Sequence, residues 1–471
     1  MTTEKQIRSL NGSAAISVPE LRTVFKDRVF APGDSGYEQA RMVFYGGIDR
    51  HPAAILRVTD ASEVSRVVTL ARQTGLELAV RSGGHSPAGY GVNEGGIVLD
   101  LSGIKSLQID VDRRTAWAGS GLTAAEYTNA VAAHNLVTGF GDTGSVGLGG
   151  LTLGGGIGYL ARKHGLTIDD LLAAEVVTAD GRILSVDAGS HPDLFWAIRG
   201  GGGNFGVVTR FQFRLHELAS VIGGMLILPA TPEVISSFLF EAENAPKQLS
   251  TIANVMVAPP MPFLPPEVHG KLILMVTLVY AGETASGERV LAPFRKLAPP
   301  LADMLRLMRY PEIYPPDDAS YHPMGVGHTM FVDSLDRKQA ATILENLKAS
   351  TASMAVAQLR VLGGAVARIP VDATAYAHRK SRIMVNLAAL YQKPEEKPVH
   401  EAWGKVFAAE LRQGDGGAYV NFLGDEGELR VHAAYPGATW DRLAAIKARY
   451  DPDNLFHLNQ NIPPEVKSDP K

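Results

Sequence analysis

The sequence predicts an α+β protein with a glycine-rich first domain and a second domain in which strands and helices alternate. Two glycine-rich stretches, 81–86 and 139–158, lie in the first half of the chain, and in the longer one ten of twenty residues are glycine. From about residue 219 to residue 414 these clusters cease, which marks a domain boundary. A chain of 471 residues is long enough for two or more hydrophobic cores.

Composition excludes several classes of protein. The net charge of −4 gives no basic footprint for nucleic acid, and the absence of cysteine excludes disulfides, thiolate metal sites and cysteine nucleophiles. No apolar run approaches the roughly 18 residues of a membrane helix, and residues 1–21 lack the apolar core of a secretory signal. We therefore expect a cytoplasmic protein without membrane or nucleic-acid partners, and export by another route stays open.

The first glycine stretch closes a compact helix and strand unit. Residues 60–63 resemble a capping box, the apolar positions from Val64 to Ala71 follow a helical face, and Gly75 ends the helix. An alternating strand over 76–80 then leads into Arg81-Ser-Gly-Gly-His-Ser86. Glycines let backbone N–H groups approach an anion, so this turn is a candidate phosphate cradle. A plain surface turn that carries a histidine is the alternative.

The stretch 139–158 keeps apolar residues at fixed places, such as Val146, Leu148 and Leu151, which a low-complexity linker lacks. We interpret it as backbone that passes close to a flat or phosphorylated ligand. A third close approach follows at 200–206. A Rossmann dinucleotide site is improbable, because residues 154–158 have neither a preceding strand nor the required six-residue glycine spacing.

The remaining elements are predicted from periodicity and turn signals. We expect hairpins over 107–117 and 171–186, a capped helix from residue 123 to about 134, and an early helix that ends at 46–47. In the second domain we expect strands over 272–280 and 382–391 and a helix over 337–347. The prolines between 259 and 266 indicate a surface connection.

Three groups of motifs together resemble a known family. They are Arg81 to His85, the run 141–158 with Arg162 to Leu166 behind it, and Gly202 to Val208, followed near the end of the chain by Tyr419-Val-Asn421, residues 442–456 and residues 459–464. This set is similar to the vanillyl-alcohol-oxidase-like (PCMH-type) FAD-linked oxidoreductases. The C-terminal motifs resemble the berberine-bridge-enzyme-like branch, in the order of its bacterial 6-hydroxynicotine-oxidase-type members.

The resemblance implies a two-subdomain FAD-binding domain into which a substrate domain is inserted. Residues 1–218, with the PCMH-type part at about 47–217, and the returning segment 415–471 would then hold FAD. Residues 219–414 would form the substrate domain, an antiparallel sheet with helices that roofs the flavin. A monomer or a homodimer is compatible with this plan, and no metal is expected.

The resemblance also assigns cofactor residues. His85 stands where the family joins a histidine to the flavin 8α-methyl carbon, and Thr143 replaces a cysteine that carries a second link in many relatives, so attachment would be single. A neutral imidazole suits this bond. The pyrophosphate would be cradled by Arg81 to Ser86, and the remaining cofactor contacts would come from Gly141, Val146, Gly147, Gly150, Gly154, Gly158, Val208 (near the adenine), Tyr419, Asn421 and Asn459.

Catalytic roles follow in the same way. Tyr419 matches a position near the flavin where a phenol with a lowered pKa would take or hydrogen-bond a substrate proton, and a tyrosine in an ordinary buried strand is the alternative. Asn386 lies where some relatives carry a glutamate base, a role that asparagine cannot fill. Ile157 replaces a tyrosine common in plant members. These differences suggest a more apolar pocket, suited to an amine or aromatic substrate.

Three functions follow from this reading. The first is an oxidase, in which a substrate C–H (of an alcohol, sugar or amine) gives hydride to flavin N5 and dioxygen reoxidises the flavin to yield hydrogen peroxide. Val146 bears on this choice, since a leucine at this point is associated with poor oxygen reactivity in the family. The second is a dehydrogenase with another acceptor, and the third is a flavin-binding protein without turnover.

Overall fold

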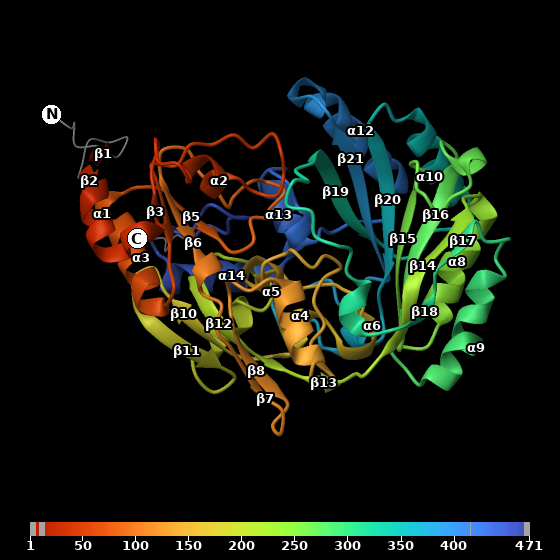
Figure 1. Ribbon diagram of the computed structural model, residues 1–471, viewed down its shortest axis with the longest axis horizontal. Helices are drawn as coiled ribbons and strands as arrows, with labels where there is room; N and C mark the ends of the chain where they lie inside the picture. The colour runs from red at the N-terminus through yellow and green to blue at the C-terminus, as the bar shows by residue number, and fades with distance from the viewer. Residues whose placement is uncertain (1–5, 9–14, 415, 466–471) are drawn as a thin grey trace, which may run out of the picture.

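The protein folds into two domains that lie side by side (Figure 1). A computed structural model describes residues 6–8, 15–414 and 416–465. The polar lead-in expected before the first helix therefore lies partly outside the described residues. The short strands β1 (Gln6–Arg8) and β2 (Ala15–Ser17) pair with each other. Within the described ranges, no helix is both long and apolar enough to cross a membrane.

One sheet of the first domain carries the first glycine turn. Its strand order is β3 (Val29–Phe30), β4 (Ala54–Arg57), β6 (Ile97–Asp100) and β5 (Leu78–Arg81), with the last three parallel. Helix α3 (Ala61–Thr74) begins where the Asp60 side chain accepts a hydrogen bond from the Glu63 N–H and ends at Gly75, whose φ is 65°. The predicted helix start at Asp60 and the stop at Gly75 are confirmed, but the reciprocal bond of a capping box is absent from the described contacts, because the Glu63 carboxylate accepts from the Thr59 N–H instead. The strand begins at residue 78 rather than 76.

The early part of the chain differs from expectation. Helix α1 (Val18–Phe25) precedes a short α2 (Tyr37–Arg41), and the predicted helix end at residues 46–47 is wrong. Met42 has an extended backbone, with φ −62° and ψ 143°, so the helix stops five residues earlier. Residues 44–47 then form a bend and a turn beside the second domain, where the Gly46 N–H donates to the Pro323 carbonyl.

The second sheet of the first domain is antiparallel. Its strand order is β11 (Ile183–Asp187), β10 (Leu171–Val177), β12 (Val207–Arg214), β8 (Thr115–Gly119) and β7 (Leu107–Asp110). Both predicted hairpins are present, and α4 (Ala124–Ala132) starts with the predicted capping box at Thr123 and Glu126. The connections carry β9 (Leu136–Val137), α6 (Ala161–His164), α7 (Pro192–Ala197) and β13 (His216–Glu217).

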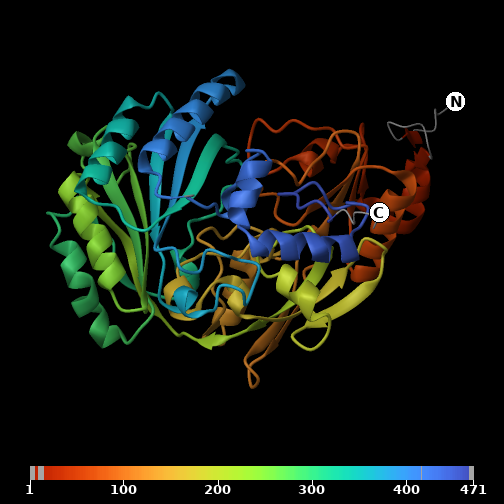
Figure 2. The same cartoon turned by 180° about the vertical axis from the view of Figure 1, so that it is seen from behind.

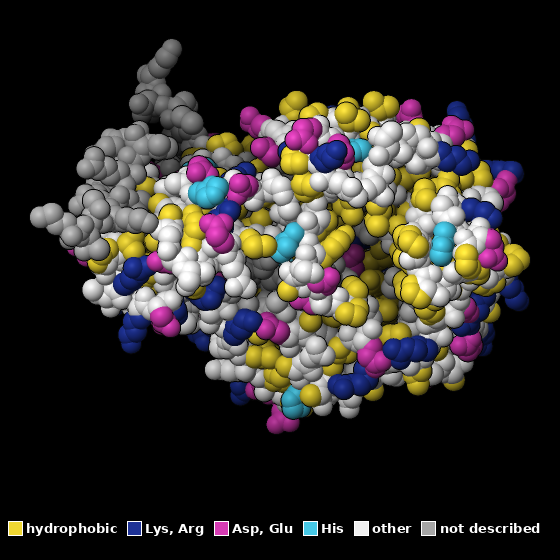
Figure 3. Space-filling model, turned by 45° about the horizontal axis from the view of Figure 1, so that its top comes forward, with side chains coloured by type: hydrophobic (Ala, Val, Ile, Leu, Met, Phe, Trp, Pro, Cys, Tyr) yellow, Lys and Arg dark blue, Asp and Glu magenta, His cyan; other side chains and the backbone are white. Residues whose placement is uncertain are grey.

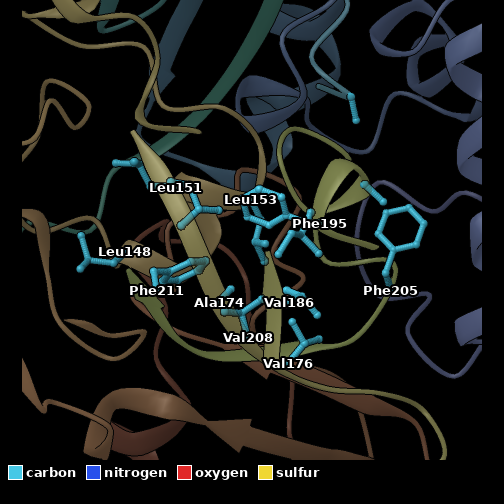
Figure 4. Close-up of a cluster of buried hydrophobic side chains, with 14 of the residues drawn as sticks. Leu148, Leu151, Leu153, Ala174, Val176, Val186, Phe195, Phe205, Val208 and Phe211 are labelled. Carbon is cyan, nitrogen blue, oxygen red and sulfur yellow. The ribbon is translucent and has the colours of Figure 1, made fainter. Parts of the chain in front are cut away.

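Part of the long glycine stretch is helical. Helix α5 (Leu148–Leu153) lies inside it, and its leucines are buried. They pack with Phe211, Val208 and other side chains of the second sheet in the core of the domain (Figure 4). The apolar residues of the glycine stretch thus anchor it to a core, which explains why it does not behave as a linker.

The second domain is built on one large antiparallel sheet. It runs from β17 (Ala302–Asp303) through β14 (Val221–Pro229), β16 (Leu272–Tyr280), β15 (Leu249–Val257), β20 (Met354–Val361) and β21 (Ile383–Tyr391) to β19 (Met324–Val332), and β18 (Arg306–Met308) also pairs with β14. The predicted strand 272–280 is confirmed in both bounds, and 382–391 is confirmed to within one residue.

Four helices of the second domain cover one face of this sheet. They are α8 (Pro232–Asn244), α9 (Thr284–Arg295), α10 (Arg337–Ala349) and α12 (Lys397–Leu411), and Figure 1 shows them along the outer side of the sheet. Alternate residues of β21, including Val385 and Leu387, are buried against them. The opposite face of the strands β19, β20 and β21 is turned towards the first domain. It carries polar side chains, among them Gln358, Arg360 and Asn386.

The chain then returns to the first domain. Helix α11 (Ala365–Arg368) leads back into β21, and after α12 the chain forms α13 (Glu428–Ala434) and α14 (Ala438–Tyr450). Seen from behind, α14 lies across the first domain (Figure 2). Lys447 is fully buried there, and its Nζ donates to Asp451 Oδ2 at 2.6 Å and to the carbonyls of Asn204 and Phe456 at 2.9 Å. This lysine fastens the returning segment to the third glycine stretch.

Removal of that lysine is expected to destabilise the first domain. Lys447→Met leaves the buried Asp451 carboxylate without its cation, and breaking a buried ion pair in this way costs about 3–5 kcal/mol. Chemical denaturation should show a loss of this size in the free energy of unfolding. Lys105→Met is the control, since the Lys105–Glu126 pair is exposed and should contribute about 1 kcal/mol or less. Equal losses for the two variants would contradict the prediction.

Candidate active site

A cavity of about 480 Å³ lies between the two domains. The three glycine stretches and the returning C-terminal segment form its wall in the first domain, and β19, β20 and β21 form its wall in the second. Most of the predicted site residues line it: Arg81, Ser82, Gly83, Gly84, His85, Ser86, Gly141, Thr143, Val146, Gly147, Gly150, Val208, Asn386, Tyr419, Asn421 and Asn459.

Two glycine stretches touch backbone to backbone beside this cavity. A Cβ placed on Gly83 would lie 2.3 Å from the backbone nitrogen of Gly147, and a Cβ on Gly147 would lie 2.3 Å from the backbone nitrogen of Gly83. No side chain fits between them at these distances. The Ser82 hydroxyl donates to the Ser120 carbonyl at 2.6 Å and accepts from the Gly149 N–H, which ties the two stretches together.

The first turn leaves its backbone donors available. Among the described residues, no carbonyl accepts a backbone hydrogen bond from the N–H groups of residues 83–86. The Arg81 guanidinium is not equally free, because it pairs with the buried Asp100 at 3.2 Å. An anion at this turn would therefore bind to backbone N–H groups. Arg81 instead stabilises the turn through its ion pair with Asp100.

His85 projects from this turn into the cavity between Phe44 and Ser145. Its ring stacks on Phe44 at 4.3 Å, and Nδ1 donates to the Gly83 carbonyl at 2.9 Å. The Ser145 hydroxyl lies 3.1 Å from Nε2 and donates to it in the neutral ring. Burial lowers the pKa of His85, so the imidazole is neutral at pH 7 and the Nε2 lone pair faces the Ser145 hydroxyl.

Within the long glycine stretch, some residues face the cavity and others face the protein. Gly150 has open space where a Cβ would be, which leaves a smooth wall. Gly154 packs instead on the Asn421 amide, and Gly158 packs on the Phe140 carbonyl, where a Cβ would lie 2.0 Å and 1.5 Å from the nearest oxygen. Gly154 and Gly158, which we expected to contact the cofactor, are not among the residues that line the cavity, and protein contacts account for the lack of a side chain at both positions.

Tyr419 is buried under the same stretch. Its hydroxyl oxygen accepts hydrogen bonds from the Gly156 N–H at 3.0 Å and from the Asn421 amide at 3.1 Å. Burial raises the pKa of Tyr419 despite these donors, so the expected lowered pKa is wrong. With two donors already directed at its oxygen, the phenol has its own proton to offer and acts as a hydrogen-bond donor.

The opposite end of the cavity is formed by the third glycine stretch and the C-terminal segment. Gly202, Gly203 and Val208 line it. The Asn459 amide donates to the Phe456 carbonyl at 3.0 Å, while its Oδ1 is buried without a partner among the described residues. This end therefore offers a free acceptor and bare backbone.

Beneath the sheet of the second domain, small residues open the cavity. In the register of the sheet, Gly327 lies opposite Ala388 and Gly325 lies opposite Leu390, and all four line the cavity. Asn386 lies one step further, beside Gln358 on β20. The space beside Asn386 exists because two of the facing residues have no side chain.

Sequence reasoning missed several residues of this site. Phe44 and Ser145 flank His85, while Asp142, Gln358 and Arg360 form a polar group at the domain boundary. Asp142 stands inside a recognised stretch, so its charge among glycines was a usable signal. The others lie on segments whose contact with the glycine stretches only the folded chain creates.

Comparison with known proteins agrees with this geometry. Residues 52–187 match the family described as "FAD binding domain", and residues 418–463 match the family described as "Berberine and berberine like". The chain is 29% identical over 451 residues to (R)-6-hydroxynicotine oxidase of Paenarthrobacter nicotinovorans, covering 93% of this chain and 96% of that protein. It is 26% identical to berberine bridge enzyme-like 17 of Arabidopsis thaliana, covering 87% and 85%.

Solved structures share the fold over nearly the whole chain. The structure of 6-hydroxy-D-nicotine oxidase from Arthrobacter nicotinovorans has a TM-score of 0.83 at 27% identity and covers 93% of this chain and 98% of that one. Chitooligosaccharide oxidase, at 22% identity, shows the fold alone, with a TM-score of 0.82 and coverage of 95% and 99%. The chain is thus an FAD-linked oxidoreductase. Its resemblance to the vanillyl-alcohol-oxidase-like flavoproteins, in the berberine-bridge-enzyme-like branch, is supported by the two family matches and by the shared fold.

The cavity fits FAD at both ends. Free N–H groups at residues 83–86 suit the pyrophosphate, and the unpartnered Asn459 Oδ1 beside Gly203 suits a donor group at the far end. Near His85 the wall is made of glycine backbone and Val146, a surface that suits a flat ring system.

Closing the gap between the two glycine stretches is expected to expel the cofactor. In Gly83→Ala the new methyl group forces residues 83 and 147 apart, a type of overpacking that costs about 1–3 kcal/mol and lowers FAD affinity by about tenfold or more. The ratio of flavin to protein after purification measures this. Gly424→Ala is the control, because no atom lies within 4 Å of its added Cβ. Full flavin content in Gly83→Ala would show that the contact is not needed.

Proposed function

We propose that this enzyme is an oxidase that holds FAD by a single covalent bond to His85 and removes hydride from a substrate carbon. When bound, the flavin accepts the two electrons of that hydride, and dioxygen then takes them with two protons to give hydrogen peroxide. Residues 1–218 with 415–471 would hold the cofactor, and residues 219–414 would hold the substrate.

The observation that carries the proposal is the position of a neutral His85 on the cavity wall. Its ring is fixed by Phe44 and by the Gly83 carbonyl, and among the described residues its Nε2 has one hydrogen-bond partner, the Ser145 hydroxyl. Many relatives form a second covalent bond to the flavin through a cysteine. This chain has no cysteine, and Thr143 stands at that position, so the second bond cannot form.

The residues around the cavity have different roles in this proposal. The N–H groups of residues 83–86 bind the cofactor phosphates, while Tyr419 presents its hydroxyl proton near the reacting face. Ile157 and Leu390 exclude water from that region. Small residues on β19 and β21 leave the space for a small-molecule substrate.

Dioxygen as the electron acceptor is supported by Val146. This side chain lines the cavity between Ser145 and Gly147, immediately beside the contact with Gly83. A valine leaves one methylene less in the path of dioxygen than the leucine associated with poor oxygen reactivity in the family. The relatives named as oxidases agree with this acceptor.

Covalent attachment is tested by denaturation. We expect wild-type protein precipitated with acid to retain yellow flavin, while His85→Ala releases all of it, because the only imidazole on this wall is lost. His51→Ala, which removes a half-exposed histidine of the same domain, should keep the flavin bound. Flavin released from the denatured wild type would disprove the bond.

The electron acceptor is tested by rapid mixing of photoreduced enzyme with aerated buffer. Val146→Leu should slow reoxidation by about tenfold or more, equivalent to about 1.4 kcal/mol in activation free energy, and change flavin reduction far less. Reoxidation of the wild type no faster than that of free reduced flavin, or a variant that matches wild type, would favour a dehydrogenase with another acceptor.

A substrate screen completes the test of function. Alcohols, sugars and cyclic amines are mixed with the enzyme without oxygen, and loss of the flavin absorbance identifies compounds that give up hydride. Hydrogen peroxide should then form in equal amounts with oxidised product when air is admitted.

A further inference from the structure

Asp142 is the one carboxylate among the described residues that line the cavity. It stands between Gly141 and Thr143 in the long glycine stretch, on the side that faces the second domain. Its Oδ2 accepts a hydrogen bond from Arg360 Nη2 at 2.6 Å, and its side chain is 23% exposed. Within the described part of the chain, no group donates to its Oδ1, which is open to the cavity.

The guanidinium of Arg360 uses its donors within the protein, and one of them binds the Asp142 carboxylate. Its Nε and Nη2 donate to Gln358 Oε1, its Nη1 donates to the Ile157 carbonyl at 3.0 Å, and its guanidinium lies over the Phe422 ring at 4.9 Å. The side chain is only 3% exposed, so it is not available to bind a substrate anion. Arg360 fixes Oδ2 of Asp142 and leaves Oδ1 pointing at the open space.

A second free acceptor lies on β21, in the wall that the second domain contributes to the cavity. Asn386 Oδ1 is buried without a hydrogen-bond partner among the described residues, and a Cβ on Gly327 would lie 3.4 Å from it. Because Gly327 has no side chain, a substrate atom has room to approach this oxygen. Unpartnered acceptors on the two walls of the cavity favour a ligand that carries hydrogen-bond donors.

Tyr419 cannot fill the same role. Its oxygen already accepts two hydrogen bonds, and burial raises its pKa, so it remains a donor. Asn386 is an amide and takes no proton. Of Tyr419, Asn386 and Asp142, only the Asp142 carboxylate can accept a proton.

We propose that Asp142, positioned by Arg360, accepts the proton that the O–H or N–H group of the substrate loses when the adjacent C–H gives hydride to the bound flavin. The proposal rests on the proposed oxidation. In this step the C–H bond breaks with both electrons leaving for the flavin, the O–H or N–H bond breaks with its proton passing to Asp142 Oδ1, and the C=O or C=N bond forms. The substrate is thus a compound that donates to Asp142 from the heteroatom next to the oxidised carbon.

Binding is measured first, without turnover, through the change that a ligand causes in the absorption spectrum of the oxidised flavoprotein. Benzylamine and benzyl alcohol each carry a donor next to a C–H, whereas benzoate offers only acceptors. We expect both donors to bind more tightly than benzoate. Asp142→Asn should weaken benzylamine binding by about tenfold or more, because it removes a charged acceptor and keeps the hydrogen bond to Arg360.

The matched control is Asp169→Asn. Asp169 also pairs with a buried arginine at the domain boundary, with both oxygens 2.7 Å from Arg379, but it does not line the cavity. Its loss should leave the order and strength of binding of the three compounds unchanged. If either variant fails to fold, the preference of the wild type for the donors over benzoate still decides the binding claim.

Proton transfer is measured on the compounds that reduce the flavin. Asp142→Asn should slow flavin reduction by about 10²-fold, and added formate should restore part of the rate in Asp142→Ala by supplying a carboxylate. Three results would each overturn the proposal: none of the three compounds binds, benzoate binds as tightly as benzylamine, or Asp142→Asn reduces its flavin at the wild-type rate. Failure of the covalent bond or of reoxidation by dioxygen would affect only the proposed oxidase.

Discussion

The contact between the backbones of Gly83 and Gly147 is the constraint on which the site depends. It joins the turn after β5 to the stretch before α5, and so sets the two sheets of the first domain at a fixed distance. Any side chain at either position would open the gap. The same contact brings the stretches that carry His85 and Val146 together, and both side chains line the cavity.

Buried arginines hold the second domain over that wall. Arg162 donates to the carbonyls of Leu362 and Ala245, Arg379 binds both oxygens of Asp169, and Arg360 binds Asp142 and the Ile157 carbonyl. Each guanidinium is a planar fork that makes several bonds at once, which fixes orientation as well as distance. The face drawn in Figure 3, by contrast, intersperses Lys and Arg with Asp and Glu, so its charges do not gather into one field. The ion pairs that define the site lie inside the molecule.

Local patterns predicted the elements well wherever a helix or strand has a clear start and stop. The helix start at Asp60, the capping box at residue 123, the hairpin at residues 180–181 and the strand 272–280 all depend on neighbours in sequence. The early helix was placed wrongly, because the residues after Arg41 leave the helix and donate to the carbonyls of Gly84 and Pro323, far along the chain. Helix α5 was missed, since its glycines disfavour a helix locally and its leucines are stabilised by the core of the domain.

The sequence by itself determined the glycine turn at residues 81–86, the longer glycine stretches, the change in composition near residue 219 and the motifs that resemble a flavoprotein family, because each is written in consecutive residues. Only the tertiary structure decided which glycines face the cavity and which face protein, that Tyr419 is a donor with a raised pKa, and that Asp142 meets Arg360. Asp142 and Arg360 are 218 residues apart in sequence, and their side chains meet only in the folded chain, where the two domains pack together. Burial and long-range pairing set the chemistry of a side chain, and neither is visible in the residues beside it.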